Sequence, residues 1–443
     1  MSVKFITGSN LPEQNSLVGD IRVPGDKSIS HRSIMFGSLA DGKTEIKGFL
    51  EGEDALATLA AFRAMGVNIE GPENGHVIVH GVGMNGLKAP KEALYLGNSG
   101  TSMRLLAGLL AGQRFSVTLK GDSSLSTRPM GRVADPLRLM GADIETAEQG
   151  RPPITLNGGA TLKGIDYDLP MASAQVKSCV LLAGIYAEGE TSTTEPAPTR
   201  DHTERMLAGM GYSLSRDGAC TRLTGGGQLK ATTIDIPADI SSAAFFMVAA
   251  SIVPDSDLIL RHVGLNPTRT GVIQILELMG ANISLSNEHL VGGEPVADIR
   301  IQYAPLVGID IPEQLVPLAI DEFPVLFIAA ACAAGTTVLT DAEELRVKES
   351  DRIQAMVDGL VALGIEAKGT TDGAIIKGGC LGVGHEQVDV QSHDDHRIAM
   401  AFAVASLRSS SKIVIHECDN VATSFPNFAS LARSVGFQLI VEA

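Results

Sequence analysis

Six helix endings of one type recur along the chain. In each, an apolar residue that closes an amphipathic helix is followed by Gly and then by an alternating run, which predicts a left-handed glycine cap leading into a strand. The endings are 69 to 84 residues apart, which is too long for a solenoid repeat and suits two helices and several strands. They are Met65-Gly66, Met140-Gly141, Met210-Gly211, Met279-Gly280, Leu363-Gly364 and Val435-Gly436.

A second set of segments alternates with these endings, and its helices are apolar on nearly every face. Helices of that kind are buried in a protein interior. Each begins on a residue that can cap a helix N-terminus, and six such N-termini in one place would form a cleft that attracts anions. Six ordinary capped helices are the alternative. The segments begin near Ser28, Ser99, Ser173, Ser241, Asp321 and Asp394.

Two similar Pro-containing sequences mark the places where the chain would cross between domains. They are Val23-Pro24-Gly25-Asp26 and Ile236-Pro237-Ala238-Asp239, and three of the six copies fall in each half. We therefore expect one domain of residues 25–237 and another of residues 1–24 and 238–443, joined by a double crossover that could act as a hinge. A chain of 443 residues also suits two domains of about 200 residues each.

Composition and charge limit the classes of partner. Hydrophobic residues at 44% and charged residues at 19% are typical of a folded globular protein. A net charge of -16 argues against nucleic acid and against an anionic membrane, because both are bound through clustered positive charge. The first residues lack the pattern of a targeting signal, no stretch is apolar enough to span a membrane, and the five cysteines lack metal-ligand spacing. We expect a cytoplasmic protein with free thiols.

Three basic motifs of the first half lie at the entries to predicted helices. The run from Lys27 to Arg32, KSISHR, combines two cations with hydroxyls in a form that can hold phosphate or carboxylate. The small residues from Gly97 to Arg104 would let backbone N–H groups face an anion. Arg128 precedes Pro129, which we expect to start a helix and so to hold the arginine in place. A basic surface helix and a tight strand-to-helix turn are the alternatives for the first two motifs.

Cations and carboxylates alternate in a fourth motif. Lys348 and Arg352 lie one turn apart with Glu349 between them, at the entry to a helix predicted from 353 to 363. A solvated salt-bridge face is the alternative. Asp321 opens an apolar helix predicted from 323 to 331, where it could be an N-cap or, flanked by cations, could accept a proton from a hydroxyl.

A fifth motif, SHDDHR from Ser392 to Arg397, leads directly into a helix that we expect to be buried. Arg397 is therefore predicted at the mouth of a core helix and not on an open surface. A metal site formed by His393, Asp395 and His396 is the alternative, although no distant ligand suggests itself to complete it.

In combination, these motifs resemble those of the 5-enolpyruvylshikimate-3-phosphate synthase family. The resemblance runs from residue 20 to residue 430, in the order PGDKS, SHR, GNSGTSMR, TRPM, SAQVKS, AIDEFPVL, RVKESDR, DDHRIAM and ATSFP. It implies an α/β fold, a two-domain inside-out α/β barrel made of six βαβαββ units, three per domain. It also implies a monomer that transfers the enolpyruvyl group of phosphoenolpyruvate to the 5-hydroxyl of shikimate 3-phosphate, releasing phosphate, without a metal or an organic cofactor.

Carried over residue by residue, the resemblance implies overlapping sets of substrate contacts. Asp321 would be the base toward the hydroxyl, Glu349 the acid toward C3 of the enol, and Lys27 a second acid toward the leaving phosphate. The implied contacts of shikimate 3-phosphate are Lys27, Ser28, Arg32, Ser173, Ala174, Gln175, Arg200, Asp321 and Lys348. Those of phosphoenolpyruvate are Lys27, Gly100, Thr101, Arg128, Gln175, Arg352, His396 and Arg397.

Three positions depart from the family pattern. Thr423 stands where many members have Lys, Ala174 where a second Ser is common, and Leu105 where Pro often follows the Arg. In these departures the chain is similar to a divergent bacterial subgroup associated with tolerance to the inhibitor glyphosate. Gly100 stands where the best-known tolerant members have Ala and leaves room for the inhibitor, so we hypothesise partial tolerance.

Two other functions fit parts of the pattern. UDP-N-acetylglucosamine enolpyruvyl transferase has the same fold but uses a cysteine in the loop before the Arg-Pro pair, and residues 113–130 contain no cysteine. A non-catalytic anion-binding protein could use the same hinge and helix N-termini. Such a protein would have little reason to place Asp321 and Glu349 among its cations.

Overall fold

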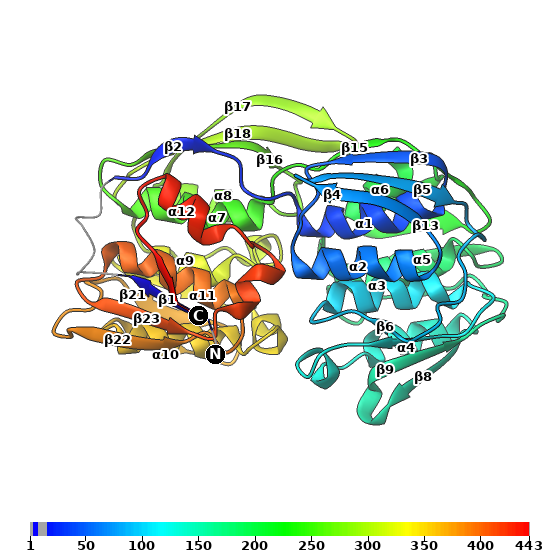
Figure 1. Ribbon diagram of the computed structural model, residues 1–443. Helices are drawn as coiled ribbons and strands as arrows, with labels where there is room; N and C mark the ends of the chain where they lie inside the picture. Colours follow the sequence, from blue (N-terminus) through cyan, green and yellow to red (C-terminus); the bar gives the residue numbers. More distant parts are fainter. Residues whose placement is uncertain (1–2, 8–15, 443) are drawn as a thin grey trace. The chain divides into compact units, whose positions relative to one another are not determined.

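The computed structural model describes residues 3–7 and 16–442, which fall into two compact units (Figure 1). Unit 1 contains the described residues up to Pro24, then Pro237–His289, and all those from Pro295 onward. Unit 2 contains Gly25–Ile236 and Leu290–Glu294. Within the described residues, no helix combines the length and the apolar character that crossing a membrane requires.

Unit 2 contains three mixed sheets of one plan, in which a parallel pair is extended by antiparallel strands. Their orders are β14-β3-β5-β4, with β15 also on β3, then β6-β7-β9-β8 and β10-β11-β13-β12. The strands are β3 (Ala40–Lys47), β4 (Asn68–Glu73), β5 (His76–Val82), β6 (Leu94–Tyr95), β7 (Val117–Lys120), β8 (Asp143–Ala147), β9 (Arg151–Asn157), β10 (Asp166–Asp168), β11 (Glu190–Thr194), β12 (Leu214–Asp217), β13 (Cys220–Thr224), β14 (Leu229–Lys230) and β15 (Thr233–Asp235).

Unit 1 also contains three sheets, and the start of the chain completes two of them. Strand β1 (Lys4–Thr7) pairs with β23 and β24, and strand β2 (Val18–Ile21) pairs with β16. The orders are β22-β23-β1-β24, β17-β18-β16-β2 and β19-β21-β20. The other strands are β16 (Asp257–Gly264), β17 (Asn282–Val291), β18 (Glu294–Gln302), β19 (Thr336–Leu339), β20 (Glu366–Gly369), β21 (Ala374–Lys377), β22 (Gln387–Gln391), β23 (Lys412–His416) and β24 (Ile440–Glu442).

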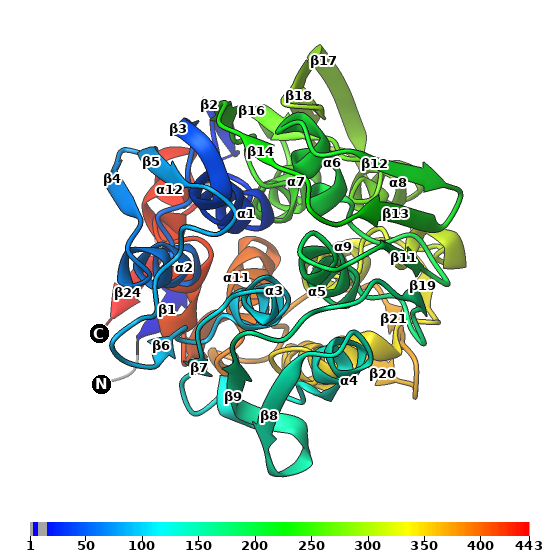
Figure 2. The same ribbon diagram turned by 90° about the vertical axis from the view of Figure 1, so that its right-hand side faces the viewer.

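Twelve α-helices alternate with these strands in the described part of the chain. The odd-numbered helices are buried along almost their whole length, whereas the even-numbered ones bury one side. In unit 2, α1, α3 and α5 lie inside the sheets, as in an inside-out α/β barrel (Figure 2). The helices are α1 (Lys27–Leu39), α2 (Glu53–Ala64), α3 (Gly100–Ala111), α4 (Gly131–Leu139), α5 (Ala174–Gly184), α6 (His202–Gly209), α7 (Ile240–Ile252), α8 (Gly271–Leu278), α9 (Phe323–Cys332), α10 (Arg352–Ala362), α11 (His396–Ala405) and α12 (Phe428–Ser434).

The predicted repeat is confirmed by the order of the elements. The series β6-α3-β7-α4-β8-β9 and β10-α5-β11-α6-β12-β13 are two uninterrupted βαβαββ repeats. All six predicted helix endings are confirmed as well, because each even-numbered helix is followed by a glycine with positive φ. These glycines are Gly66, Gly141, Gly211, Gly280, Gly364 and Gly436.

The predicted helix starts are confirmed only in part. Ser99 and Ser173 accept backbone N–H groups as N-caps of α3 and α5. The caps of α1, α7 and α11 are instead the aspartates Asp26, Asp239 and Asp395. In these three the chain enters the helix one or two residues away from the predicted cap, and the side chain at that point supplies the acceptor.

Two local predictions are wrong. Asp321 is not an N-cap, because Glu322 occupies the cap position of α9 and Asp321 precedes it. Pro129 does not start a helix, since α4 begins at Gly131 after the cap residue Met130. The carboxylate of Asp321 is bound by Arg352, and the guanidinium of Arg128 is bound by Asn98. These partners are about 30 residues away, so rules for helix termini do not predict them.

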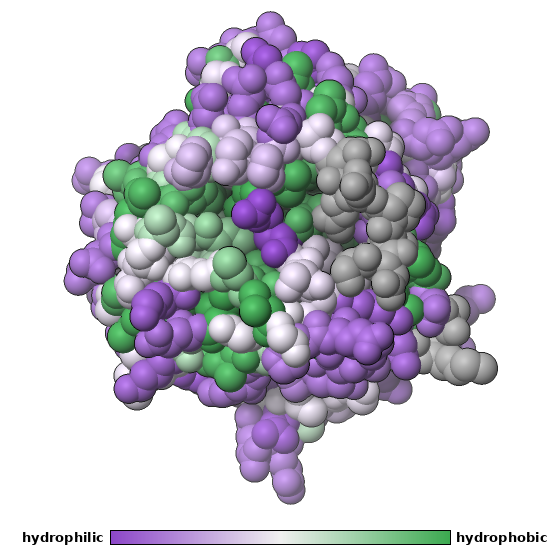
Figure 3. Space-filling model, turned by 90° about the vertical axis from the view of Figure 1, so that its left-hand side faces the viewer, coloured by the Kyte–Doolittle hydropathy of each residue, from purple (hydrophilic) through white to green (hydrophobic). Residues whose placement is uncertain are grey.

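Each unit encloses one hydrophobic core, and the five cysteines are free thiols as predicted. On the face shown in Figure 3, apolar residues form patches, and polar residues lie around and between them. In unit 2, α3 packs closely on α5. A Cβ atom at Gly108 would lie 2.1 Å from the carbonyl oxygen of Cys179, so only glycine permits this approach.

Replacing Gly108 with Ala should therefore force α3 and α5 apart. We expect the free energy of unfolding to fall by about 1–3 kcal/mol, the usual cost of overpacking a core. Denaturant unfolding followed by circular dichroism measures this. Gly131→Ala is the matched control, because a Cβ there meets only Asp135 Oδ2 at 3.8 Å. Equal stability of the two variants would contradict the prediction.

Candidate active site

Lys27 is the first residue of α1 and forms an ion pair at the surface of unit 2. Its Nζ atom lies 2.7 Å from Asp54 Oδ2, and the two side chains are 21% and 10% exposed. Asp54 belongs to the acidic first turn of α2 and was not identified from the sequence. The pair keeps a cation and a proton acceptor together at the start of a buried helix.

Arg32 lies deeper in unit 2 than the motif suggested. Its guanidinium is buried and donates to Thr203 Oγ1 at 2.7 Å, Ser178 Oγ at 2.9 Å and the carbonyl oxygen of Ser28 at 2.9 Å. Burial lowers the pKa of Arg32 to about 10, although the charge of Glu204 opposes this. The structure therefore fixes Arg32 beneath Ser28, between α1, α5 and α6.

His31, from the same motif, is not a cation of the site. It is fully buried, and its Nδ1 atom is 2.7 Å from Thr58 Oγ1. Burial lowers the pKa of His31 well below its usual range, and the charges of Lys27 and Arg32 add to the effect. The ring is therefore neutral near pH 7.

The N-terminus of α3 gathers several of the predicted residues of unit 2. Gln175, in the first turn of α5, accepts from Arg104 Nη1 at 2.6 Å and donates to Thr101 Oγ1 at 3.0 Å. A Cβ atom at Gly100 would lie 3.0 Å from Arg104 Nη1 and 3.3 Å from Arg128 Nη1. Two guanidinium groups thus border Gly100 closely.

Arg128 is held without a helix of its own. Its Nη2 atom donates to Asn98 Oδ1 and, at 3.3 Å, to Ser124 Oγ. Asn98 belongs to the small-residue turn before α3, so the second and third basic motifs meet in space. Neither Asn98 nor Arg104 was assigned a role from the sequence, although both lie within the 97–104 motif.

The remaining predicted residues of unit 2 flank α5 and α6. Ser173 caps α5, and Ala174 is the first residue of that helix. Arg200 is half-buried, in the segment that precedes α6. The buried helices of unit 2 therefore begin at Lys27, Gly100 and Ala174.

In unit 1 the guanidinium of Arg352 is surrounded by three carboxylates. It donates to Glu349 Oε2 at 2.6 Å, to Asp395 Oδ2 at 2.8 Å and to Asp321 Oδ1 at 3.2 Å. Burial would lower the pKa of Arg352, but the charges of Asp395 and Glu349 raise it instead. Arg352 therefore stays charged although its side chain is only 2% exposed. The alternative for this motif, a salt-bridge face exposed to solvent, does not describe Arg352.

The carboxylates around Arg352 differ in exposure. Asp395 is completely buried and caps α11, and the side chain of Glu349 is 30% exposed. Burial favours the neutral acid at Asp395, yet the charge and hydrogen bond of Arg352, together with the charge of His396, lower the pKa of this carboxyl. Glu349 is therefore the more accessible acid, whereas Asp395 orients the guanidinium.

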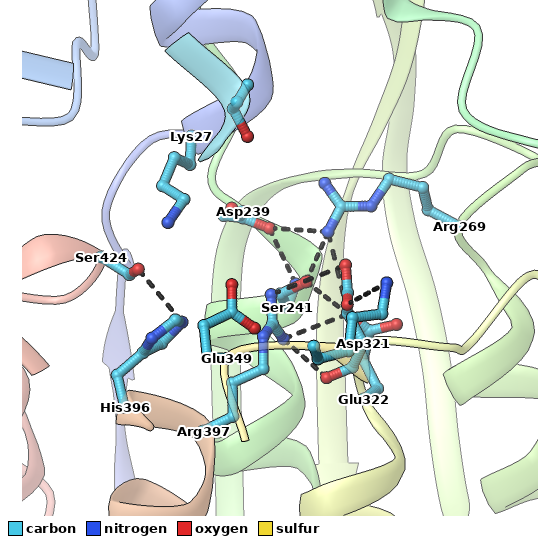
Figure 4. Close-up of polar contacts among 12 residues, drawn as sticks. Lys27, Asp239, Ser241, Arg269, Asp321, Glu322, Glu349, His396, Arg397 and Ser424 are labelled. Carbon is cyan, nitrogen blue, oxygen red and sulfur yellow. Dashed lines mark hydrogen bonds and ion pairs between the residues drawn. The ribbon is translucent and has the colours of Figure 1, made fainter. Parts of the chain in front are cut away.

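Asp321 contacts cations from two directions. Lys348 Nζ lies 3.5 Å from Asp321 Oδ1, and Arg397 Nη1 donates to the carbonyl oxygen of Asp321 at 2.7 Å. Figure 4 shows Asp321, Glu349 and Arg397 close together. Lys348 also pairs with Glu344, 2.5 Å away and one turn earlier. Glu344 was not identified from the sequence, although its spacing of four residues was a usable signal.

His396 is the first residue of α11, and its Nε2 atom is 3.1 Å from Ser424 Oγ. Thr423 is buried and donates to the carbonyl oxygen of Asn420 at 2.7 Å. The predicted metal alternative is not supported, because Asp395 is bound to Arg352. No group of three or more His, Cys, Asp or Glu residues in 3–7 and 16–442 could hold a metal ion.

Comparisons with known proteins identify the family of this chain. A family model described as EPSP synthase (3-phosphoshikimate 1-carboxyvinyltransferase) matches residues 11–431. The 3-phosphoshikimate 1-carboxyvinyltransferase of Methylococcus capsulatus is 66% identical over 423 residues, 96% of each chain. That of Nitrosococcus oceani is 64% identical over 424 residues, 96% of this chain and 95% of the other.

Solved structures give the same result. EPSP synthase from Acinetobacter baumannii is 59% identical, with a TM-score of 0.89 and complete coverage of both chains. The enolpyruvyl transferase NikO from Streptomyces tendae has a TM-score of 0.79 at 16% identity, covering 100% of this chain and 99% of the other, which shows the fold alone. These relatives do not favour the UDP-N-acetylglucosamine alternative. The chain therefore belongs to the EPSP synthase family and transfers the enolpyruvyl group of phosphoenolpyruvate to shikimate 3-phosphate.

Proposed function

We propose that Asp321 and Glu349 carry the proton transfers of this reaction. Asp321 takes the proton of the 5-hydroxyl as its oxygen attacks C2 of phosphoenolpyruvate, while Glu349 donates a proton to C3. The product is a tetrahedral intermediate with the phosphate still attached. Glu349 then takes a proton back from C3 as the bond to phosphate breaks, and Lys27 protonates the leaving phosphate.

The observation that carries this proposal is the set of contacts around Arg352. One buried guanidinium touches both Asp321 and Glu349, within 3.2 Å and 2.6 Å. For Asp321, the adjacent cation favours the ionised carboxylate that a base requires, and its charge also stabilises the anionic transition state. For Glu349, the contact supports its position beside Asp321. The greater exposure of Glu349 suits an acid that must reach a substrate carbon.

We assign the substrate contacts to the two sets implied by the resemblance. Arginines are suited to both sets, because a guanidinium binds carboxylate or phosphate through two parallel N–H bonds. Shikimate 3-phosphate would contact Lys27, Ser28, Arg32, Ser173, Ala174, Gln175, Arg200, Asp321 and Lys348. Phosphoenolpyruvate would contact Lys27, Gly100, Thr101, Arg128, Gln175, Arg352, His396 and Arg397.

We also propose that the enzyme acts as a monomer in the cytoplasm.

We propose further that the enzyme is partly tolerant to glyphosate. Tolerance is suggested by Thr423, which places a neutral side chain where many members have a cation. Gly100 opposes it, because glycine places no side chain beside Arg104 and Arg128. A wild-type inhibition constant as low as that of an ordinary sensitive enzyme would contradict partial tolerance.

Replacing Asp321 with Asn should remove the base while keeping the shape of the side chain. We expect kcat to fall by about 10²–10⁴-fold, the usual contribution of a general base. Phosphate release measures turnover, and calorimetric titration measures whether shikimate 3-phosphate still binds. Asp358→Asn, an exposed carboxylate on α10, is the matched control. Unchanged turnover of the Asp321 variant would refute the assigned role.

Replacing Glu349 with Gln should stop proton exchange at C3. In D₂O and with shikimate 3-phosphate present, the wild-type enzyme should introduce deuterium into the methylene group of phosphoenolpyruvate, because the intermediate forms and reverts. Mass spectrometry should show this exchange reduced by about 10²-fold or more in the variant. The exposed Glu343→Gln is the control. Exchange at the wild-type rate would assign the acid to another residue.

Replacing Gly100 with Ala should weaken the binding of glyphosate. The added methyl group would press on the guanidinium ends of Arg104 and Arg128, at 3.0 and 3.3 Å. We expect the inhibition constant of glyphosate to rise by more than about tenfold, equivalent to about 1.4 kcal/mol. The KM of shikimate 3-phosphate should stay unchanged and serves as the internal control. An unaltered inhibition constant would show that this space is not used by the inhibitor.

A further inference from the structure

A buried ionic cluster lies behind Asp321 and Arg397 in unit 1. It consists of Asp239, Ser241, Arg269 and Glu322, each at most 7% exposed. The four residues come from the start of α7, the segment before α8 and the start of α9 (Figure 4). Taking such charges out of water costs stability unless each has a partner, so their mutual contacts are the compensation.

Arg269 and Ser241 hold the carboxylate of Glu322 from one side. Arg269 Nη2 donates to Ser241 Oγ, is 3.1 Å from Asp239 Oδ1 and lies 3.8 Å from Glu322 Oε1. Ser241 Oγ donates to Glu322 Oε1. Asp239 Oδ1 also accepts from the backbone N–H of Ser241 at 2.9 Å. The carboxylate of Glu322 is therefore fixed in position.

On its other side, Glu322 faces the guanidinium of Arg397. Glu322 Oε1 lies 3.6 Å from Arg397 Nη1, the atom that also donates to the carbonyl oxygen of Asp321. Although Glu322 occupies the N-cap position of α9, its side chain makes no cap hydrogen bond. A carboxylate at the N-cap position usually accepts a hydrogen bond from a backbone N–H group of the first helical turn. The carboxylate of Glu322 contacts Ser241, Arg269 and Arg397 instead.

The guanidinium of Arg397 needs such a partner. Burial lowers its pKa, and the like charge of Arg352 lowers it further, whereas Glu322 and Asp239 act in the opposite direction. Two buried guanidinium groups repel one another, and the adjacent carboxylate of Glu322 offsets the energy of that repulsion.

We propose that Glu322, held by Ser241 and Arg269, is a positioning residue that keeps the guanidinium of Arg397 in the orientation in which it binds phosphoenolpyruvate. The inference rests on the proposed role of Arg397. Glu322 itself touches no substrate. Its effect is confined to phosphoenolpyruvate, because bidentate binding of a carboxylate or phosphate depends on the plane of the guanidinium.

Replacing Glu322 with Gln tests the inference, because the amide keeps the shape and removes the charge. We expect the KM of phosphoenolpyruvate to rise at least about tenfold and that of shikimate 3-phosphate to stay within about twofold. The exposed Glu313→Gln is the matched control and should behave like the wild type. An unchanged or lower KM for phosphoenolpyruvate, or an equal rise for both substrates, would overturn the inference.

A double-mutant cycle with Arg397→Gln separates this inference from the role of Arg397. If Glu322 acts through Arg397, then E322Q should add less than about threefold to the KM of phosphoenolpyruvate in the R397Q background. Full additivity would overturn the inference. If R397Q has the wild-type KM for phosphoenolpyruvate, the proposed role of Arg397 and the inference are both wrong. If this KM rises in R397Q but not in E322Q, only the inference is wrong.

Ser241→Ala provides a second variant that leaves every charge in place. Loss of the hydroxyl frees Glu322 on one side, so the same selective rise in the KM of phosphoenolpyruvate is expected, by about threefold or more. This variant decides the question if E322Q does not fold. An S241A enzyme with wild-type KM values for both substrates would then count against the inference.

Discussion

Burying the charge of Arg352 is the constraint on which the candidate site of unit 1 depends. A guanidinium removed from water requires carboxylates around it, and breaking one such pair leaves an uncompensated charge. Asp321, Glu349 and Asp395 supply that compensation from the segments that open α9, α10 and α11. The same contacts that stabilise Arg352 therefore place the two carboxylates of the proposed chemistry.

The repeat architecture makes such a convergence possible. Each βαβαββ repeat contributes one helix that is buried along almost its whole length, as expected of a helix that lies inside the sheets. The starts of these buried helices carry the polar residues, whereas the glycine endings belong to the outer helices. The residues of the candidate site therefore lie at the starts of the buried helices, and the structural glycines lie at the ends of the outer helices.

Local grouping of charge reconciles an acidic chain with two anionic substrates. In unit 2, Arg104 and Arg128 donate to the neutral amide oxygens of Gln175 and Asn98. In unit 1, Arg352 and Arg397 are held by carboxylates that also serve the proposed chemistry or its positioning. The net charge of -16 is the total for the whole chain, whereas cations are concentrated near the N-termini of its buried helices.

The sequence by itself determined the six repeats, the buried helices and the motifs at their entrances, because hydrophobic periodicity and glycine caps act over a few residues. The hinge and the individual residue roles stay predictions. Only the tertiary structure decided that Asp321 is no cap but a partner of Arg352, 31 residues away, and that Arg32 is buried beside Thr203, 171 residues away. It alone decided the place of Glu322, whose partners lie on α7 and α11. Contacts of this kind depend on which helices meet, and that is settled by packing of the whole unit.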